Sequence, residues 1–247
     1  MRKKKIAIIS LTACEGCQIA LLDLGKRFFD FLKKVELVDF NLLEEQPFPK
    51  EKIDIAFVEG NPITKEDLKV LKNIRKQTKT LVVLGNCAAL GGIPEMKNYQ
   101  GKEKTIRYIY KNLANIANPE IKEIDNFVKV DFVIPGCPID NEEFLKYSEI
   151  LIKGEIPKIP QKPVCSECPF QGEKECFLSS KEPCLGPITL AGCEAVCTKN
   201  SFPCYGCRGP IKNIKTEGFI KTLEKMKNKE EIEDDLEIFG LKDMIKI

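Results

Sequence analysis

The strongest constraint in this sequence is a run of eight cysteines between residues 165 and 207, called here the cysteine-rich segment. Their spacing is C-x2-C-x7-C-x7-C and then, after eight residues, C-x3-C-x6-C-x2-C. A cubane iron-sulfur cluster is bound by four cysteine thiolates, so eight thiols can hold two clusters. The spacing divides them into two sets of four: Cys165, Cys168, Cys176 and Cys184, followed by Cys193, Cys197, Cys204 and Cys207.

Zinc is the main alternative, because a single C-x2-C pair suits zinc as well as an iron-sulfur cluster. A zinc site could use the outer cysteines of the segment, but it would leave the four inner ones without a role. The segment also has few apolar residues and many turn residues, so bound metal is expected to order it as much as packing does. We therefore favour iron-sulfur clusters, and keep a zinc-stapled interaction protein as an alternative.

The first 155 residues show short apolar runs that alternate with helical patterns. The predicted strands span residues 5–10, 35–40, 53–58, 80–85 and 130–134. The predicted helices span residues 18–34 and 141–153, with a further helix that begins at Thr64 and a less regular one over 102–115. This alternation predicts an α/β fold built on a flavodoxin-like, doubly wound parallel sheet.

Four more cysteines follow the ends of these strands. Cys14 and Cys17 come after the first strand, Cys87 after the fourth and Cys137 after the fifth. The carboxyl ends of parallel strands lie at one edge of a sheet, where such folds bind their ligands. We therefore expect these four cysteines to converge and to hold a third cluster. A flavin, the usual ligand of this fold, needs hydroxyls and glycines in the loop that here carries two thiols.

Two charged residues lie beside the predicted ligands. Glu59 ends the third strand, and we expect its carboxylate to set the polarity around the third cluster; the alternative is an acid that caps the loop at Gly60. Arg208 follows Cys207, and it is expected either beside cluster sulfur, against a partner, or in solvent.

Charge and composition exclude several functions. The 247 residues include 39 basic and 37 acidic ones, and this balance gives no basic field for nucleic acid. The chain contains no histidine, which excludes histidine acid-base catalysis and histidine-bound metal within it. No catalytic residue is predicted here. The remaining function is to hold clusters in a row and pass electrons.

Prolines between residues 156 and 163 mark a linker. The predicted domains are a flavodoxin-like domain over 1–155, an iron-sulfur domain over 160–210 and a helical tail over 211–247. No apolar run approaches the roughly 18 residues of a membrane span, and no signal segment is recognisable. We therefore expect a cytoplasmic protein, without direct membrane insertion, whose thiols are reduced and free to bind metal.

Several motifs together resemble the small, electron-transferring subunit of nickel-iron hydrogenases. The resemblance covers nearly all of the chain up to Pro210. Within this family, the chain most resembles the delta subunit of cytoplasmic sulfhydrogenases and the small subunits of methanogen hydrogenases. The motifs are Cys14-x2-Cys17, Glu59-Gly60, Gly85-x-Cys87, Gly136-Cys137-Pro138, Cys184-Leu-Gly-Pro-Ile-Thr-x-Ala-Gly-Cys193 and Cys204-x-Gly-Cys207-Arg-Gly.

This resemblance implies three 4Fe-4S clusters and two partner subunits. A separate large subunit would hold the nickel-iron centre, and a flavin- or iron-sulfur-containing subunit would reduce the acceptor. The four cysteines of the N-terminal domain would bind the proximal cluster, and this cluster would face the large subunit. The resemblance gives the proximal set as Cys14, Cys17, Cys87 and Cys137, the medial set as Cys193, Cys197, Cys204 and Cys207, and the distal set as Cys165, Cys168, Cys176 and Cys184.

The chain departs from some members of that family. Many exported relatives have histidine in place of Cys165 and proline in place of Cys197. An all-thiolate ligand set implies low reduction potentials. The extra cysteines of oxygen-resistant relatives are absent, which predicts oxygen sensitivity. The related subunit of respiratory complex I has two adjacent cysteines at this position, whereas this chain has Cys14-Glu-Gly-Cys17. A multi-cluster electron-transfer subunit of a non-hydrogenase redox complex stays open as an alternative.

Overall fold

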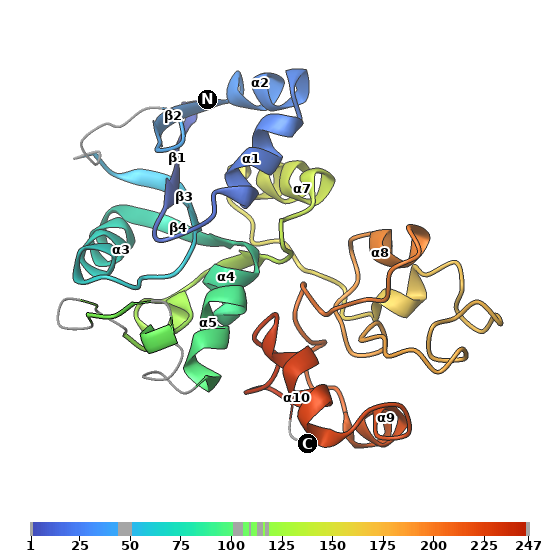
Figure 1. Ribbon diagram of the computed structural model, residues 1–247. Coiled ribbons are helices and arrows are strands. Elements are labelled where there is room, and N and C mark those ends of the chain that lie inside the picture. The colour runs from blue at the N-terminus through green and yellow to red at the C-terminus, as the bar shows by residue number, and fades with distance from the viewer. Residues whose placement is uncertain are drawn as a thin grey trace.

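The computed structural model describes residues 2–43, 51–100, 106–108, 110–112, 116 and 119–245. A five-stranded sheet in the order β2-β1-β3-β4-β5 forms its N-terminal part (Figure 1). Every neighbouring pair of strands is parallel. The order is that of flavodoxin-like, doubly wound folds, so the predicted fold class is confirmed. The strands are β1 (Lys4–Ser10), β2 (Val35–Phe40), β3 (Ile53–Glu59), β4 (Thr78–Leu84) and β5 (Phe132–Ile134).

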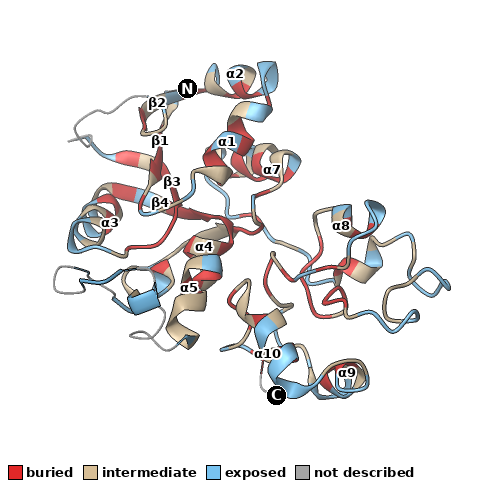
Figure 2. Ribbon diagram, in the orientation of Figure 1, coloured by how far each residue is buried: buried red, intermediate tan, exposed pale blue. Residues whose placement is uncertain are grey.

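Helices cover both faces of this sheet. Successive side chains of a strand point to opposite sides, and because the strands are apolar on both sides, each face needs a covering layer. Ile6 and Ile8 of β1 belong to the apolar cluster under one set of helices, whereas Ala7 and Ile9 belong to the cluster on the other face. Figure 2 shows the buried residues concentrated along the strands between these layers. The first face is covered by α1 (Gly16–Asp23), α2 (Lys26–Leu32) and α7 (Asn141–Ile152), and the second by α3 (Lys65–Gln77) and the short η1 (Ile124–Asn126).

Helix boundaries follow the sequence signals at α3 and depart from them at α1. At the start of α3, as predicted at Thr64, Thr64 Oγ1 accepts the Asp67 N–H at 3.0 Å while the Asp67 carboxylate accepts the Thr64 N–H at 2.9 Å; these two bonds form a capping box. The single helix predicted over 18–34 is wrong. The chain forms α1 and α2 instead, separated at Gly25, whose φ of +54° is incompatible with a continuous right-handed helix.

Helices were not predicted for the residues directly after β4. They form α4 (Gly85–Leu90) and α5 (Gly92–Tyr99), so Cys87 lies on a short helix. The helix expected over 102–115 falls largely outside the described residues. These short helices begin at the carboxyl edge of the sheet, and they therefore position side chains there.

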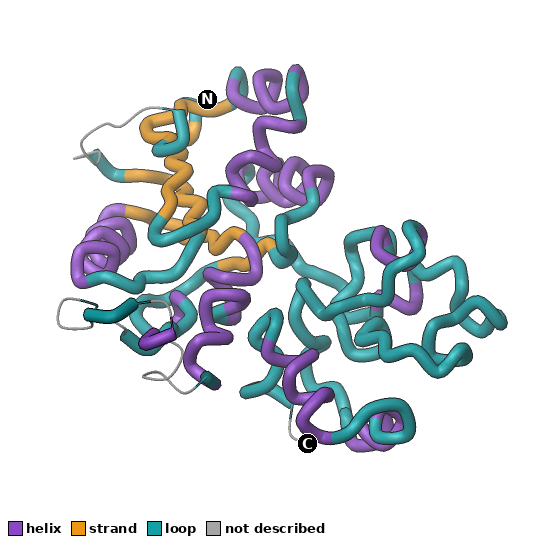
Figure 3. The backbone as a smooth tube through the Cα atoms, viewed as in Figure 1, coloured by secondary structure: helices purple, strands orange, loops and turns teal. Residues whose placement is uncertain are grey.

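Beyond α7 the chain is mostly turns and loops, with the short helices η2 (Val164–Ser166) and α8 (Val196–Lys199) (Figure 3). Two helices follow in the tail, α9 (Glu217–Leu223) and α10 (Lys229–Glu237). Their apolar side chains pack against Leu185 and Ile188 of the cysteine-rich segment. After α10, the carbonyl of Phe239 accepts a hydrogen bond from Asn86 Nδ2 at 3.0 Å, so the tail contacts both parts of the molecule.

Among the residues described, no helix combines the length and the apolar character that crossing a lipid bilayer requires.

Candidate metal centres

The four cysteines of the N-terminal part lie together at the carboxyl edge of the sheet. Cys14 is exposed in the loop after β1, and Cys17 is buried in the first turn of α1. Cys87 lies in the first turn of α4, and Cys137 follows β5. Burial, and then the proximity of Cys87 and Cys14, raises the pKa of Cys137 to about 11. The same convergence shows at Cys17, whose pKa is raised by burial, by Glu59, and by Cys137 and Cys87.

The shape of the backbone accommodates these thiols closely. Gly85, the first residue of α4, has a φ of +81°, and a Cβ built on it would lie 2.5 Å from Cys17 Sγ. Any side chain there would therefore displace a predicted ligand. Next to it, Asn86 donates its backbone N–H to the carbonyl of Gly136 at 2.8 Å. This bond joins the loops that carry Cys87 and Cys137.

Glu59 is buried beside the same cysteines, with 4% of its surface exposed. Its Oε1 accepts the N–H of Cys17 at 3.0 Å, and its Oε2 accepts the N–H of Gln18 at 3.1 Å. Burial raises the pKa of this carboxyl, and the two N–H donors oppose the rise. The carboxylate thus holds the first turn of α1, and with it the loop between the first two cysteines.

Sequence reasoning missed Asn61 as a further support of this region. Asn61 is fully buried after β3, and its Nδ2 donates to the carbonyl of Cys87 at 2.7 Å. Its backbone also pairs with Thr12, in the loop before Cys14. The Glu59-Gly60-Asn61-Pro62 sequence signalled a loop there, but nothing in it identified the contact with Cys87.

The eight cysteines of the cysteine-rich segment separate into two sets around two cavities. A small cavity of about 60 Å³ lies among one set, together with Gly186 and Thr198. Burial and then three neighbouring thiols raise the pKa of Cys165 to about 11, which shows that this set is mutually close. A larger cavity of about 880 Å³ lies among the other set. The cysteines around the small cavity are Cys165, Cys168, Cys176 and Cys184. Those around the large one are Cys193, Cys197, Cys204 and Cys207, joined by Cys137.

The three sets touch one another in order. The backbone N–H of Cys204 donates to Cys184 Sγ at 3.2 Å, which joins the two sets of the cysteine-rich segment. Burial raises the pKa of Cys207 to about 11, while the backbone N–H of Cys137 opposes this rise by hydrogen bonding to the thiol. That contact joins the set at the sheet edge to the set around the large cavity. The set around the large cavity thus neighbours both Cys137 at the sheet edge and the set around the small cavity.

The donor chemistry of these sites fits iron-sulfur clusters. All twelve cysteines are free of disulfide bonds. Crowded, buried thiols favour the protonated form, and bound metal ions supply the positive charge that makes thiolates stable. In the part of the chain that the structure describes, no three Cys, Asp or Glu side chains converge as ligands of one metal ion do. In a cubane cluster each thiolate binds a different iron atom, so the four cysteines can lie farther apart than four ligands of a single metal ion.

Arg208 is not solvated, which corrects one of the interpretations of the sequence. Its side chain is buried between the two parts of the molecule, with 3% of its surface exposed, and it forms an ion pair with Glu143 at 2.8 Å. Glu143 lies in the first turn of α7, where acidic residues are common because they interact favourably with the helix dipole. Nothing in the sequence therefore indicated that Glu143 pairs with Arg208.

The sequence matches a protein family over residues 14–149, the family described as NADH ubiquinone oxidoreductase, 20 Kd subunit. It is 36% identical to sulfhydrogenase 2 subunit delta of Pyrococcus furiosus, over 96% of this chain and 99% of that protein. It is 34% identical to a vhu subunit of the F420-non-reducing hydrogenase of Methanocaldococcus jannaschii, over 83% of this chain and 81% of that protein. The chain belongs to the family of nickel-iron hydrogenase small subunits. It is therefore a hydrogenase subunit other than the catalytic large subunit, as predicted.

Solved structures share the fold of this small subunit. A chain of the NAD+-reducing nickel-iron hydrogenase in the H2-reduced state superimposes with a TM-score of 0.56 at 27% identity, over 64% of this chain and 96% of that chain. A chain of the Ni-Fe-Se hydrogenase of Desulfomicrobium baculatum gives a TM-score of 0.61 over 86% of this chain and 96% of that chain. Its identity is 16%, so that likeness concerns the fold alone.

Proposed function

We propose that this small subunit relays electrons between the nickel-iron site of a separate large subunit and an acceptor-reducing subunit. Three 4Fe-4S clusters, when bound, would supply centres that each accept and donate one electron. The proximal ligands would be Cys14, Cys17, Cys87 and Cys137, the medial ligands Cys193, Cys197, Cys204 and Cys207, and the distal ligands Cys165, Cys168, Cys176 and Cys184. The observation that supports this proposal is that the cysteines gather at the sheet edge and around two cavities, with contacts between Cys137 and Cys207 and between Cys204 and Cys184.

The residues around the quartets have supporting roles in this proposal. Glu59 would fix the loop of Cys14 and Cys17 through its bonds to the N–H groups of Cys17 and Gln18, and would place negative charge beside the proximal set. Such neighbours shift the potential of a cluster. This chain's contribution to catalysis is thus positioning and redox tuning, while the metals perform the chemistry.

The surface around the proximal quartet supports docking of the large subunit there. Cys14 is exposed, and so are two large apolar side chains that follow proximal cysteines in the sequence: Ile19 after Cys17, at 48%, and Ile93 after Cys87, at 50%. Exposed apolar side chains beside a functional site are typical of a surface that a partner covers. The acceptor-reducing subunit would then bind on the side of the distal quartet.

The proposal includes the division of the chain and its compartment. Separate buried clusters within residues 6–151 and 164–245 support a flavodoxin-like domain over 1–155 and an iron-sulfur domain over 160–210 followed by the tail over 211–247. A cytoplasmic location is proposed from the thiol content, since that compartment keeps cysteines reduced.

Metal and subunit analysis of the natively purified complex tests the proposal. We expect about twelve iron atoms in this chain, four for each of three cubanes, and nickel in a larger subunit that copurifies with it. Zinc in place of iron would refute the cluster assignment. Intact clusters without a nickel-bearing partner would instead favour an electron-transfer subunit of a different redox complex.

Single cysteine variants test the division into sets. Replacing Cys193 by Ser should remove or convert only the medial cluster, and replacing Cys176 only the distal one, as read from electron paramagnetic resonance (EPR) spectra of the reduced complex. Spectra in which the Cys176 variant loses the signal assigned to the medial cluster would contradict the division. An all-thiolate medial site also predicts a low potential, so a medial centre that titrates well above the other two would contradict that part.

A further inference from the structure

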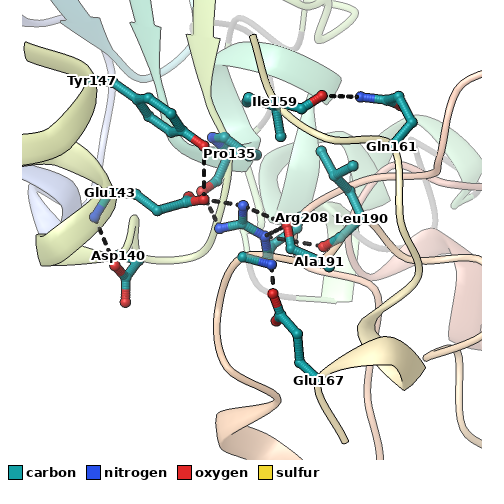
Figure 4. Close-up of polar contacts among 11 residues, drawn as sticks. Pro135, Asp140, Glu143, Tyr147, Ile159, Gln161, Glu167, Leu190, Ala191 and Arg208 are labelled. Carbon is teal, nitrogen blue, oxygen red and sulfur yellow. Dashed lines mark hydrogen bonds and ion pairs between the residues drawn. The ribbon is translucent and has the colours of Figure 1, made fainter. Parts of the chain in front are cut away.

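A buried ion pair between Arg208 and Glu143 joins the two parts of this small subunit (Figure 4). The pair lines the same cavity as Cys137 and Cys207. Arg208 Nη2 lies 2.8 Å from Glu143 Oε2, and their side chains are 1% and 10% exposed. Tyr147, one turn along α7, donates its hydroxyl to Glu143 Oε1 at 3.1 Å. Burying a charged pair is costly, so a structure that keeps one needs full hydrogen bonding around it.

The guanidinium of Arg208 meets this requirement with backbone carbonyls. Its Nε donates to the carbonyl of Leu190 at 3.0 Å, and its Nη2 donates to that of Ala191 at 2.9 Å. Its Nη1 reaches across to the N-terminal part and donates to the carbonyl of Pro135 at 3.2 Å. A guanidinium presents five donors spread over a rigid plane, so it can bind acceptors on different sides at once. The three donors of a lysine ammonium radiate from one nitrogen and cannot reproduce that arrangement.

These contacts fall on the loops that carry the predicted ligands of two quartets. Pro135 lies two residues before Cys137, a proximal ligand, and Ala191 lies two residues before Cys193, a medial ligand. Arg208 itself follows Cys207 directly. One side chain therefore fastens the ends of three ligand loops, and Cys137 and Cys207 line the same cavity as Arg208 and Glu143.

Gly192 shows how closely the backbone is packed against this pair. Its φ is +123°, and a Cβ built on it would collide with both Glu143 Oε1 and Arg208 Nη2. Its N–H donates to Glu167 Oε2 at 2.9 Å. Gly192, which has no space for a side chain of its own, thus holds the neighbouring Cys193 next to the ion pair.

We propose that Arg208, paired with Glu143, is a positioning residue for electron transfer: it holds the Cys137 loop against the Cys207 loop and so sets the coupling of the proximal and medial clusters. This inference rests on the proposed assignment of those clusters. It also assigns the pair an electrostatic role. Glu143 balances the positive charge of Arg208 beside the medial quartet, and nearby charge contributes to the potential of a cluster.

Two variants of the whole complex test the proposal, each with a matched control elsewhere in the chain. Arg75 and Asp131 form a similar pair in the N-terminal part: Arg75 Nη1 lies 2.6 Å from Asp131, and its Nη2 donates to the carbonyls of Thr78 and Lys79 at 2.6 and 3.0 Å. This pair joins α3, β4 and the start of β5, and it contacts none of the cysteine loops described above. Arg75→Lys and Asp131→Asn therefore control for the loss of a comparable pair.

Arg208→Lys should weaken the coupling, because the carbonyls of Pro135 and Ala191 are bound by two different guanidinium nitrogens, and the single nitrogen of a lysine cannot occupy both positions. We expect electron transfer between the proximal and medial clusters to slow about tenfold, as changes around metal ligands commonly do, and the magnetic interaction between the two reduced clusters to weaken in EPR spectra. Arg75→Lys should leave both unchanged. Wild-type coupling in an iron-complete Arg208→Lys complex would overturn the proposal.

Glu143→Gln tests the electrostatic role in a nearly isosteric variant. It leaves the charge of Arg208 uncompensated, and positive charge favours the reduced cluster, so the medial potential should rise while the distal potential stays unchanged. Asp131→Asn should shift neither. A medial potential that stays constant or falls, or that rises equally in Asp131→Asn, would overturn this part.

Loss of iron also gives a decisive result. If Arg208→Lys lacks the medial cluster alone, the arginine is required to hold the ligand loops and the proposal stands. If it loses iron from all three sites to the same extent as Arg75→Lys, the pair acts only on general stability and the proposal fails. A wild-type complex without a cluster at the medial quartet would refute the proposed function itself, before any variant is compared.

Discussion

The N-terminal part of this small subunit and its cysteine-rich segment are stabilised by different interactions. In the N-terminal part, the sheet and its helices enclose large apolar side chains such as Phe57, Phe144 and Leu71 completely. Around the cysteine-rich segment, half of the buried residues in one apolar cluster are predicted ligands: the buried members are Val164, Ala195, Cys184 and Cys204. We therefore expect the hydrophobic effect to supply most of the stability of the first region, and bound metal to supply a larger share in the second, where apolar packing is limited to residues such as Leu185 and Ile188.

The largest expected effect is a difference in the response to metal removal. Chelation of iron under reducing, anaerobic conditions should abolish the hydrogen-exchange protection of residues 165–207, because bound metal supplies most of the order there. Strands β1, β3 and β4 should keep their protection in the same sample, and they serve as the internal control. Equal protection of both regions after iron removal, measured by mass spectrometry, would break the comparison.

A core truncation should have the opposite regional effect. Phe57→Ala, at the centre of the sheet, should lower the free energy of unfolding of the N-terminal part by about 3–5 kcal/mol. Phe29→Ala is the control, since Phe29 is 63% exposed and its loss should change stability by less than about 0.5 kcal/mol. Urea unfolding followed by circular dichroism measures both. The comparison would be weakened if the Phe57 variant were as stable as the Phe29 variant.

A smaller, pH-dependent effect is expected at Asp39 in β2. Burial raises the pKa of this carboxyl to about 6, despite an opposing hydrogen bond from the N–H of Phe40. The unfolded chain ionises it near 3.8, so the folded state carries the cost of a buried charge above pH 6. Asp39→Asn should therefore gain about 1–3 kcal/mol of stability at pH 7.

That gain should shrink as the pH falls from 6 toward 4, because the folded wild-type carboxyl then becomes neutral. Thermal or urea unfolding of both proteins across this range measures the difference, and it should persist after iron removal because β2 belongs to the N-terminal part. A gain that is constant from pH 7 to pH 4 would show that burial of the charge is not its cause.

The smallest effect concerns a helix cap. Thr64→Ala removes the side-chain acceptor of the capping box at α3 and should cost about 1 kcal/mol. Thr216→Ala is the matched control, because Thr216 precedes α9 without a capping bond from its side chain. Differential scanning calorimetry should show a lower melting temperature only for the Thr64 variant. A similar decrease in both would contradict the assigned cap.

The sequence predicted the strands well because each is an apolar run bounded by turn residues. β1, β2 and β3 begin and end within one residue of the expectation, and β4 differs by two residues at its start. The break between α1 and α2 was missed because a single glycine inside a helical pattern is compatible with a continuous helix. Only the left-handed φ of Gly25 reveals the break.

Long-range polar contacts were the least predictable part of the site. Glu143 and Arg208 are 65 positions apart, and each had a sufficient local explanation, as a helix-start acid and as a residue beside a cysteine. Asn61 was missed for the same reason. The cysteine sets were easier to predict, because spacing along the chain and strand topology both restrict where thiols can meet.

The contact between Asn86 and Phe239 has a consequence for biogenesis. These residues are 153 positions apart, and Gly240 packs against the carbonyl of Leu90 at the end of α4. The helix that carries Cys87 is therefore completed by residues that leave the ribosome long after it. Until they arrive, this helix lacks the contacts that the tail makes at Asn86 and Leu90, so its final packing is reached only when synthesis of the tail is finished.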